Sequence, residues 1–276
     1  MTEMNKQLVV GLVQITSSSS IEDNLNRSEE IIEQLVRQGA QAIVLPESFA
    51  LMEKYNGQKL EYLEQHGNGP IQSWMSEIAK KHHVLLVGGT IAIQSNIENR
   101  PYARCYIYSE DGNELTHYDK IHMFDVSVKE GESYSESANT LAGERPVVFE
   151  WNNIKFGCSV CYDLRFPELY RYYQTHNIDV ILAPSAFTLA TGKVHWKLLL
   201  KARAVENLAF VVAPNQTGTH DNQRKTYGHS MTVDPWGAIV GELAEQQGGL
   251  LCTLDISKIE SIKEKFPVHQ HRKLMS

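Results

Sequence analysis

The sequence predicts an α/β fold, organised as a single domain over residues 1–276. Short apolar runs of strand length alternate along the chain with longer segments whose apolar residues recur at helical spacing, a pattern typical of sheets covered by helices. The chain is 42% hydrophobic over 276 residues, and no stretch of it reads as a linker. One large hydrophobic core is therefore expected.

The first half of the chain opens with a strand at 8–15, followed by a serine-rich turn and a helix at 21–38. Leu25, Ile31 and Leu35 lie at helical spacing and form the apolar stripe of this helix. Further elements of this half are expected at 41–45 (strand), 71–81 (helix), near 84–93 (strands) and at 102–109 (a strand ending in the Asp111-Gly112 hairpin signal).

The second half begins with a long polar stretch at 120–143 that has no apolar period. A loop of this length inside a compact domain is usually functional. Beyond it, strands are expected at 147–150, 154–160, 180–183, 210–214, 230–233, 239–243 and 250–254, and helices at 167–175 and 194–208.

Composition narrows the classes of partner. The net charge is −7, the isoelectric point is about 5.9, and basic residues occur only in short groups, which is not the pattern of a nucleic-acid-binding protein. The N-terminus lacks the apolar core of a signal peptide, and no window approaches the ~18 apolar residues of a membrane span. A cytoplasmic protein with a small-molecule substrate is expected, and its four cysteines are expected to be reduced.

The segment at 154–169 places Cys161 where an apolar strand gives way to a polar turn and then to a helix. Cys158 falls in the apolar stripe of the strand, whereas Cys161 falls off it. Pro167-Glu168 suits the first turn of the helix, where a missing N–H is tolerated and an acid meets the positive dipole end. The α/β-hydrolase elbow uses the same arrangement to expose a nucleophile beside backbone N–H donors, so Cys161 is expected to be a nucleophile.

Other roles for these cysteines remain open from the residues alone. Cys158 and Cys161 have the CxxC spacing of a redox pair or of half a zinc site. A structural zinc ion takes four ligands, however, and Cys105 and Cys252 are far apart in strand-like surroundings. Cys161 as a small buried hydrophobe is the third alternative, against which the polar turn that follows it argues.

A cysteine nucleophile needs a base, and a developing oxyanion needs a cation or aimed donors. Glu47 follows a buried strand at its carboxyl end, where it is held rigidly and can take the thiol proton. Lys120 lies between residues that read as packed, so its charge is available to favour the thiolate and the oxyanion. Taken singly, Glu47 as a solvated strand-end acid and Lys120 as a surface lysine are the ordinary alternatives.

Three segments together carry a family resemblance. Leu45-Pro46-Glu47, Asp119-Lys120-Ile121-His122 and the CYDLRFPE run at 161–168 occur in the order, and with the spacing, of a Glu-Lys-Cys signature. The chain resembles the nitrilase, or carbon–nitrogen hydrolase, superfamily over about residues 9–272. The resemblance implies a four-layer αββα sandwich whose subunits commonly pair into an αββααββα assembly.

The resemblance also implies roles for the site residues. Glu47 is the general base, Cys161 the nucleophile, and Lys120 with the backbone N–H of Tyr162 stabilises the oxyanion. A second glutamate that the family places after the lysine falls on Glu136. No metal ion or organic cofactor is implied, and the chain is expected to form a homodimer or a higher homo-oligomer.

Further segments are similar to the branch that contains the ω-amidases and the deaminated-glutathione amidases. The segments are SAFTLATG at 185–192 with His195-Trp196, which indicates the branch, and YGHSM at 227–231, DPWG at 234–237 and FPVHQHR at 266–272, which look more like the deaminated-glutathione amidases. One departure lies at Lys129-Glu130, where the catalytic loop of the family often carries Pro-Gly.

The resemblance implies hydrolysis of a linear amide through a thioester on Cys161. The expected substrate is deaminated glutathione, cleaved to 2-oxoglutarate and Cys-Gly. Arg165 is expected to meet the carboxylate of the acyl group or to tie down the turn, and Phe187 with Thr188 to line the pocket. The alternatives are an ω-amidase acting on 2-oxoglutaramate, a nitrilase or carbamoylase, and, from a different class, a non-catalytic interaction protein or a CxxC redox or metal protein.

Overall fold

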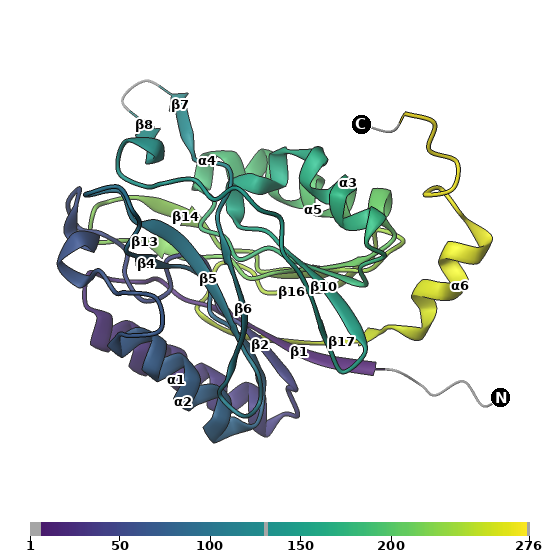
Figure 1. Cartoon of the computed structure of the whole chain (residues 1–276), viewed down its shortest axis with the longest axis horizontal. Helices are drawn as coiled ribbons and strands as arrows, with labels where there is room; N and C mark the ends of the chain where they lie inside the picture. The colour runs from purple at the N-terminus through teal and green to yellow at the C-terminus, as the bar shows by residue number, and fades with distance from the viewer. Residues whose placement is uncertain (1–6, 130–131, 275–276) are drawn as a thin grey trace.

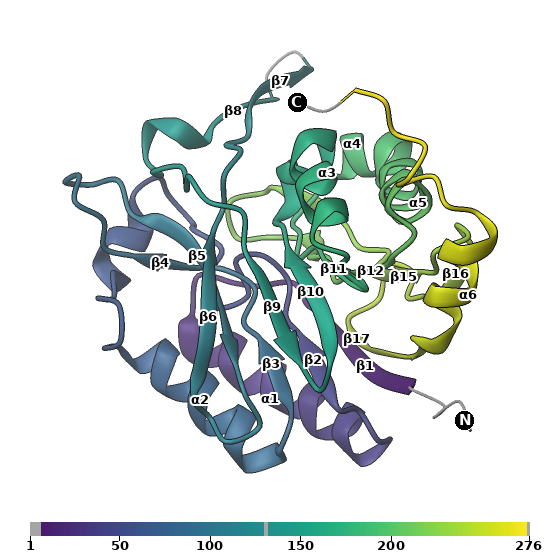
Figure 2. The same cartoon turned by 45° about the vertical axis from the view of Figure 1, so that its right-hand side comes forward.

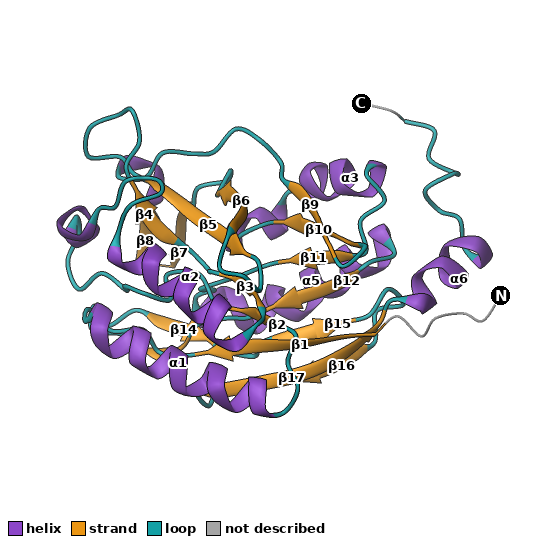
Figure 3. Ribbon diagram, turned by 60° about the horizontal axis from the view of Figure 1, so that its bottom comes forward, coloured by secondary structure: helices purple, strands orange, loops and turns teal. Residues whose placement is uncertain are grey.

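The structure, a computed structural model, describes residues 7–129 and 132–274. Two β-sheets pack face to face, and helices cover the outer face of each sheet (Figures 1 and 3). The layers therefore run helix, sheet, sheet, helix. Both the α/β class and the αββα sandwich predicted from the sequence are confirmed.

The first sheet is made of β1 (Gln7–Gln14), β2 (Ala42–Val44), β3 (Leu85–Val87), β4 (Ile91–Ile93), β5 (Tyr102–Tyr108), β6 (Glu114–Asp119) and β17 (Gly248–Asp255). Its order is β17-β1-β2-β3-β5-β4, with β6 paired to β5. The strands β1, β2 and β3 are parallel, whereas β17 is antiparallel to β1. The outer face packs against α1 (Ile21–Arg37) and α2 (Pro70–His82) (Figure 3).

The second sheet is made of β9 (Val148–Trp151), β10 (Ile154–Cys158), β11 (Val180–Leu182), β12 (Phe210–Ala213), β15 (Met231–Val233) and β16 (Ile239–Glu242). Its order is β16-β15-β12-β11-β10-β9, and β10, β11 and β12 run parallel. The helices α3 (Pro167–Thr175) and α5 (Lys197–Asn207) cover its outer face (Figure 1).

The remaining described elements lie outside the two sheets. They are the hairpin of β7 (Asp125–Lys129) and β8 (Glu132–Ser135), the hairpin of β13 (Thr217–Thr219) and β14 (Lys225–Tyr227), α4 (Leu189–Thr191), a π-helical turn (Gly192–Trp196), α6 (Ser257–Lys265), and 3-10 helices at Gln58–Tyr62, Glu136–Ala138 and Cys161–Arg165. Among the described residues, no helix is both long enough and apolar enough to cross a membrane.

Alternation along β1 produces the layers. Val10 and Leu12 belong to the same apolar cluster as residues of the second sheet, whereas Val13 belongs to the cluster under α1 and α2. These three side chains are almost fully buried, and each such burial stabilises the fold by roughly 1.5–3 kcal/mol. Gly11 lets α1 approach the sheet, because a Cβ at that position would lie 2.9 Å from the Cδ1 atom of Leu35 in α1.

Two predictions about the connecting regions were wrong. The stretch at 120–143, predicted to be an aperiodic loop, contains the β7–β8 hairpin and a 3-10 helix. Within the described residues this hairpin pairs only with itself, and it projects from one end of the sandwich (Figures 1 and 2). Apolar and polar residues alternate along β7, but over only five residues in a polar stretch, which is too short a signal to predict a strand. The helix predicted at 194–208 begins earlier, with α4 and the π-helical turn, and α6 and the β13–β14 hairpin were not predicted.

A buried histidine anchors the β13–β14 hairpin. His220, in the turn between the two strands, is 2% exposed. Its Nδ1–H donates to the carbonyl of Ser17 and its Nε2 accepts from the hydroxyl of Thr226, both at 2.8 Å. Burial is the main cause that lowers the pKa of His220 from 6.5 to about 4, so the ring is neutral near neutral pH.

We expect His220 to make the folded state lose stability in mild acid. As the pH falls, the unfolded chain takes up the imidazole proton near 6.5 but the folded chain only near 4, so the stabilisation is present above pH 6.5 and lost towards pH 4. The loss amounts to about 3 kcal/mol, at about 1.4 kcal/mol per pH unit. Urea unfolding of the wild type and of His220→Gln across this range measures the effect, and curves of unfolding free energy that stay parallel would contradict it.

Candidate active site

The residues singled out in the sequence meet in one pocket at the carboxyl ends of parallel strands. Glu47 lies three residues after β2, Cys161 three residues after β10, and Lys120 directly after β6. Because β2 belongs to the first sheet and β10 to the second, the pocket forms where the two sheets meet. The cavity measures about 530 Å³, and its lining also includes Glu136, Tyr162, Arg165, Phe187, Thr188 and Arg224.

Cys161 begins a 3-10 helix, so the bend predicted after the strand is a helical turn that leads into α3. Its φ of 47° lies in the left-handed region, which costs a non-glycine residue about 1–3 kcal/mol. The Cys161 N–H donates to the carbonyl of Pro184 at 3.0 Å and helps to hold this conformation. The N–H of Tyr162 occupies the second position of the 3-10 helix, where no carbonyl of the helix can accept from it, so it is available to donate to a group outside the helix.

Asp163 connects the nucleophile turn to the segment that carries Lys120. Its side chain is fully buried and accepts hydrogen bonds from the Tyr118 hydroxyl at 2.8 Å and from the Val160 N–H at 2.8 Å. It also accepts from the backbone N–H of His122 at 3.0 Å and lies 2.7 Å from the Nδ1 atom of that residue. Asp163 was not among the site residues predicted from the sequence. It positions the turn and is not in contact with the expected reaction centre.

Lys120 is enclosed between two carboxylates. Its side chain is 2% exposed, and its Nζ lies 2.8 Å from Glu47 Oε1 and 2.9 and 2.8 Å from the two carboxylate oxygens of Glu136. Burial alone lowers the pKa of a lysine, but here the charges of Glu136 and Glu47 outweigh it and hold the pKa above its ordinary value. Lys120 therefore stays protonated and supplies a fixed positive charge beside Cys161.

Cys161 is a protonated thiol at rest. Burial is the main cause that raises its pKa well above the ordinary value, and the neighbouring Glu47 carboxylate is the second. The charge of Lys120 acts in the opposite direction but does not outweigh them. A buried thiol of this kind must hand its proton to a base before it attacks, and Glu47, 6% exposed, is the carboxylate in contact with it. Gln216 fixes the position of that base, because its Nε2–H donates to the Glu47 carbonyl at 3.0 Å.

Glu136 approaches Lys120 from the loop after β8. Its side chain is 22% exposed, and its Oε2 accepts from the N–H of Phe124 at 2.7 Å as well as from Lys120. The carboxylate is thus anchored on the backbone while it binds the ammonium, an arrangement suited to positioning the lysine. Glu130 and the side chain of Lys129 lie outside the part of the chain that the structure describes, so the departure noted at these residues is not located.

The residues expected to contact the substrate lie along the pocket wall. The Arg165 guanidinium lies over the rings of Tyr162 and Phe187, 5.6 and 5.7 Å from their centroids, and its Nη1 is 3.2 Å from His195 Nδ1. Thr188 lines the pocket and also has a structural role, because its hydroxyl caps the short helix α4. Arg224, from the β13–β14 hairpin, reaches the same pocket and was not predicted.

The CxxC alternative finds no support in the geometry. Cys158 is 2% exposed inside the core cluster. Burial is the main cause that raises the pKa of its thiol well above the ordinary value. Cys158 and Cys161 are both free thiols. Within residues 7–129 and 132–274, neither of the side-chain groups that have the geometry to hold a metal ion includes a cysteine.

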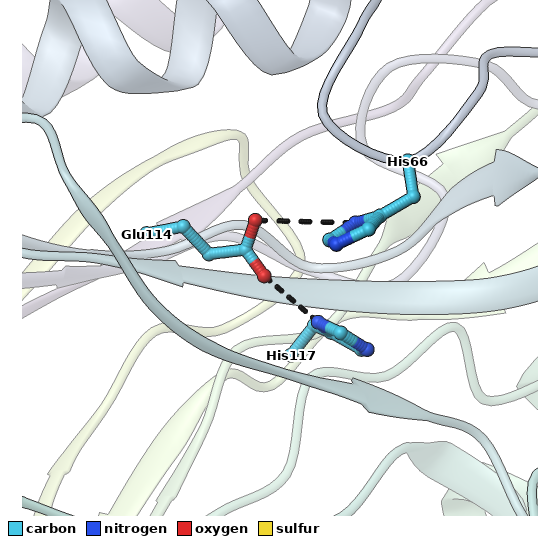
Figure 4. A group of neighbouring side chains, drawn as sticks. All are labelled: His66, Glu114 and His117. Carbon is cyan, nitrogen blue, oxygen red and sulfur yellow. Dashed lines mark hydrogen bonds and ion pairs between the residues drawn. The ribbon is translucent and has the colours of Figure 1, made fainter.

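One of those two groups consists of His66, Glu114 and His117 (Figure 4). Glu114 lies between the two imidazoles, its carboxylate oxygens 2.8 Å from His117 Nδ1 and 4.0 Å from His66 Nδ1. His66 Nδ1 also lies 3.0 Å from the Tyr106 hydroxyl. These side chains are partly exposed to solvent and none of them lines the pocket that contains Cys161. The contacts among these side chains form a hydrogen-bond network at the surface, which explains why they lie together.

Comparison with known proteins agrees with this arrangement. The family model described as carbon-nitrogen hydrolase matches residues 9–264. The chain is 38% identical over 272 residues to the deaminated glutathione amidase of Synechocystis, covering 97% of this chain and 98% of that one. It is 30% identical over 264 residues to the mouse omega-amidase NIT2, covering 96% and 94%.

Among solved structures, Saccharomyces cerevisiae Nit3, described as a member of branch 10 of the nitrilase superfamily, superimposes with a TM-score of 0.87. The sequence identity is 31%, and the match covers 98% of this chain and 97% of that one. The sequence match and the structural match both extend over nearly the whole chain. The chain therefore belongs to the carbon–nitrogen hydrolase family of the nitrilase superfamily.

Proposed function

We propose that the protein is an amidase that cleaves a small amide through a thioester on Cys161. The observation that carries the proposal is the buried ammonium of Lys120, held at 2.8 Å from Glu47 and from Glu136 at the mouth of the nucleophile turn. A fixed cation, a carboxylate base and a thiol in one cavity are the groups that acyl transfer from an amide needs. The relatives named as amidases point to the same class of bond.

In the proposed reaction Glu47 takes the thiol proton as the Cys161 sulfur attacks the amide carbonyl carbon. Lys120 and the Tyr162 N–H stabilise the oxyanion. Protonated Glu47 then gives the proton to the leaving nitrogen, the C–N bond breaks and the thioester forms. A water molecule loses its proton to Glu47 and attacks the thioester carbonyl, and the C–S bond breaks to release the acid and restore the thiol.

The proposed substrate is deaminated glutathione, whose hydrolysis gives 2-oxoglutarate and Cys-Gly. The names of relatives that are 35–38% identical support this choice. Arg165 supports it as well, because a guanidinium on the pocket wall suits the carboxylate of a 2-oxoglutaryl group. Omega-amidase activity on 2-oxoglutaramate is the second candidate, favoured by the relatives that are 30% identical and bear that name.

Hydrolysis of the two amides side by side tests the proposal. Purified protein is offered deaminated glutathione or 2-oxoglutaramate, and the products are resolved by mass, with Cys161→Ala as the blank. We expect faster release of Cys-Gly than of ammonia. Faster ammonia release would assign the protein to the ω-amidases, and turnover of neither amide would reject both substrates.

Pairing of subunits through the helical layers is also part of the proposal. Val194, in the π-helical turn before α5, is 67% exposed, and Leu198, in the first turn of α5, is 66% exposed. Trp236 is 64% exposed. Apolar side chains that remain this exposed on one chain are typical of a surface that another subunit covers. A homodimer or a higher homo-oligomer is therefore proposed.

A further inference from the structure

We propose that the pocket selects amides that carry a carboxylate on both sides of the scissile bond, with Arg224 binding the carboxylate of the leaving group. This inference rests on the proposed amidase function and names the substrate class of the same site. Arg165 then serves the acyl side and Arg224 the amine side. Deaminated glutathione has both carboxylates, whereas 2-oxoglutaramate has only the one on the acyl side.

The first observation is the incomplete hydrogen bonding of Arg224. Its Nη2 donates to the carbonyl of Ala186 at 2.6 Å, and its guanidinium lies over the ring of Tyr134, 5.2 Å from the centroid. Its Nε is buried and has no hydrogen-bond partner in the described part of the chain. A buried donor left unpaired costs free energy, and such donors often mark a place that a ligand completes.

Arg104 provides a comparison, because the Nε–Nη2 edge of its guanidinium is paired with a carboxylate. Its Nε and Nη2 donate to the two carboxylate oxygens of Asp119 at 2.6 and 2.8 Å. The corresponding edge of Arg224 is half occupied by a carbonyl, and within the described residues no carboxylate lies at ion-pair distance from it. A carboxylate entering the pocket would supply the missing second acceptor as the guanidinium turns towards it.

The second observation is the place of Arg224 relative to the nucleophile. The carbonyl of Ala186 accepts a hydrogen bond from the Arg224 guanidinium, and the N–H of Ala186 interacts with the Cys161 thiol. The next residue, Phe187, lies under the guanidinium of Arg165. Two consecutive residues beside the reacting sulfur therefore each contact a different arginine, so both guanidiniums lie within reach of one small substrate.

The third observation is the charge balance of the pocket wall. The ammonium of Lys120 is neutralised by Glu47 and Glu136, and that of Lys59 is bound by Asn139 and Thr140 with Glu53 at 3.8 Å. Arg165 and Arg224 differ from these lysines, because in the described part of the chain neither has a carboxylate partner. Counted over the whole lining, five basic side chains (Lys54, Lys59, Lys120, Arg165 and Arg224) face three carboxylates (Glu47, Glu53 and Glu136), an excess of two positive charges that matches a ligand with two negative charges.

The test measures binding apart from turnover. In the Cys161→Ala background, calorimetry compares deaminated glutathione with the same molecule whose glycine carboxylate is replaced by a carboxamide. With Arg224 present, the acid is expected to bind about 10- to 100-fold more tightly than the carboxamide, as for a charge-assisted hydrogen bond. Arg224→Gln should reduce this preference below about threefold, and Arg224→Lys, which keeps the charge but not the fork, should retain part of it.

Two control variants isolate the effect. Arg165→Gln should weaken both ligands together and keep the preference for the acid. Arg27→Gln removes an exposed guanidinium that donates to Gln247 and does not line the pocket, so it should keep the preference too. A preference that survives Arg224→Gln, one that disappears with Arg165→Gln instead, or the binding of neither ligand would each overturn the inference. Failure of the wild type to cleave either amide would instead reject the proposed function, while the preference in binding still reports on Arg224.

Discussion

Replacing Cys161 with alanine is expected to lower amide turnover by at least about 10³-fold while the protein remains folded. The side chain is small, so its loss removes the proposed nucleophile without opening a large cavity, and the main interaction lost with it is the hydrogen bond between the thiol and Glu47. Steady-state hydrolysis of the preferred amide, with the thermal transition measured on the same samples, tests both parts of the prediction.

Cys158→Ala is the matched control, because Cys158 is equally buried and only three residues away. We expect a loss of about 1 kcal/mol of stability from poorer packing and no comparable loss of turnover. Equal inactivation by both substitutions, together with thiol titration that detects a Cys158–Cys161 disulfide, would show that the two cysteines act as a redox pair.

The second large effect is expected from Lys120→Met, which should lower both turnover and stability. Without the ammonium, Glu47 and Glu136 face each other in a largely buried site, and removal of one partner of a buried ion pair typically costs about 3–5 kcal/mol. Loss of the cation proposed to stabilise the oxyanion is expected to lower kcat by a further factor of about 10²–10³ in the molecules that remain folded. Urea unfolding and active-site-normalised kinetics separate the two effects.

Lys81→Met provides the matched surface comparison. Lys81 also lies between two carboxylates, 2.7 Å from Glu29 and 3.1 Å from Glu33, but its side chain is 53% exposed. Solvent screens such pairs, so little change in the free energy of unfolding is expected. If Lys120→Met were no more destabilising than Lys81→Met, the ion pairs of Lys120 would not be the ones that hold the pocket together.

The parts of the site that could be predicted are those with a local signal. The strands that lead to Glu47 and Cys161 carry apolar residues at strand spacing, the packed surroundings of Lys120 made it the candidate cation, and the resemblance added Glu136. That Glu47 and Glu136 would both bind Lys120 depends on how two separate sheets and a hairpin pack, which no spacing along the chain encodes.

The residues that were not predicted lack such a local signal in the sequence. Asp163 reads as an ordinary turn acid, and only its four polar contacts, two of them fully buried, reveal that it joins the nucleophile turn to the segment after β6. Arg224 lies in a short hairpin that is largely polar and gives no apolar period, so neither the hairpin nor its guanidinium was expected in the pocket. Long-range contacts of polar residues leave little trace in a single sequence.

The pairing of β17 with β1 has a consequence for how the protein folds. The two strands pair along eight residues, from Gln7–Asp255 to Gln14–Gly248, although almost all of the described chain lies between them. Contacts between segments so distant along the chain form slowly, because the entropy of closing a long loop is lost before the contact can stabilise the fold. Until β17 is in place, β1 presents an open edge with which another chain can pair, so aggregation during refolding is expected to compete with completion of the first sheet.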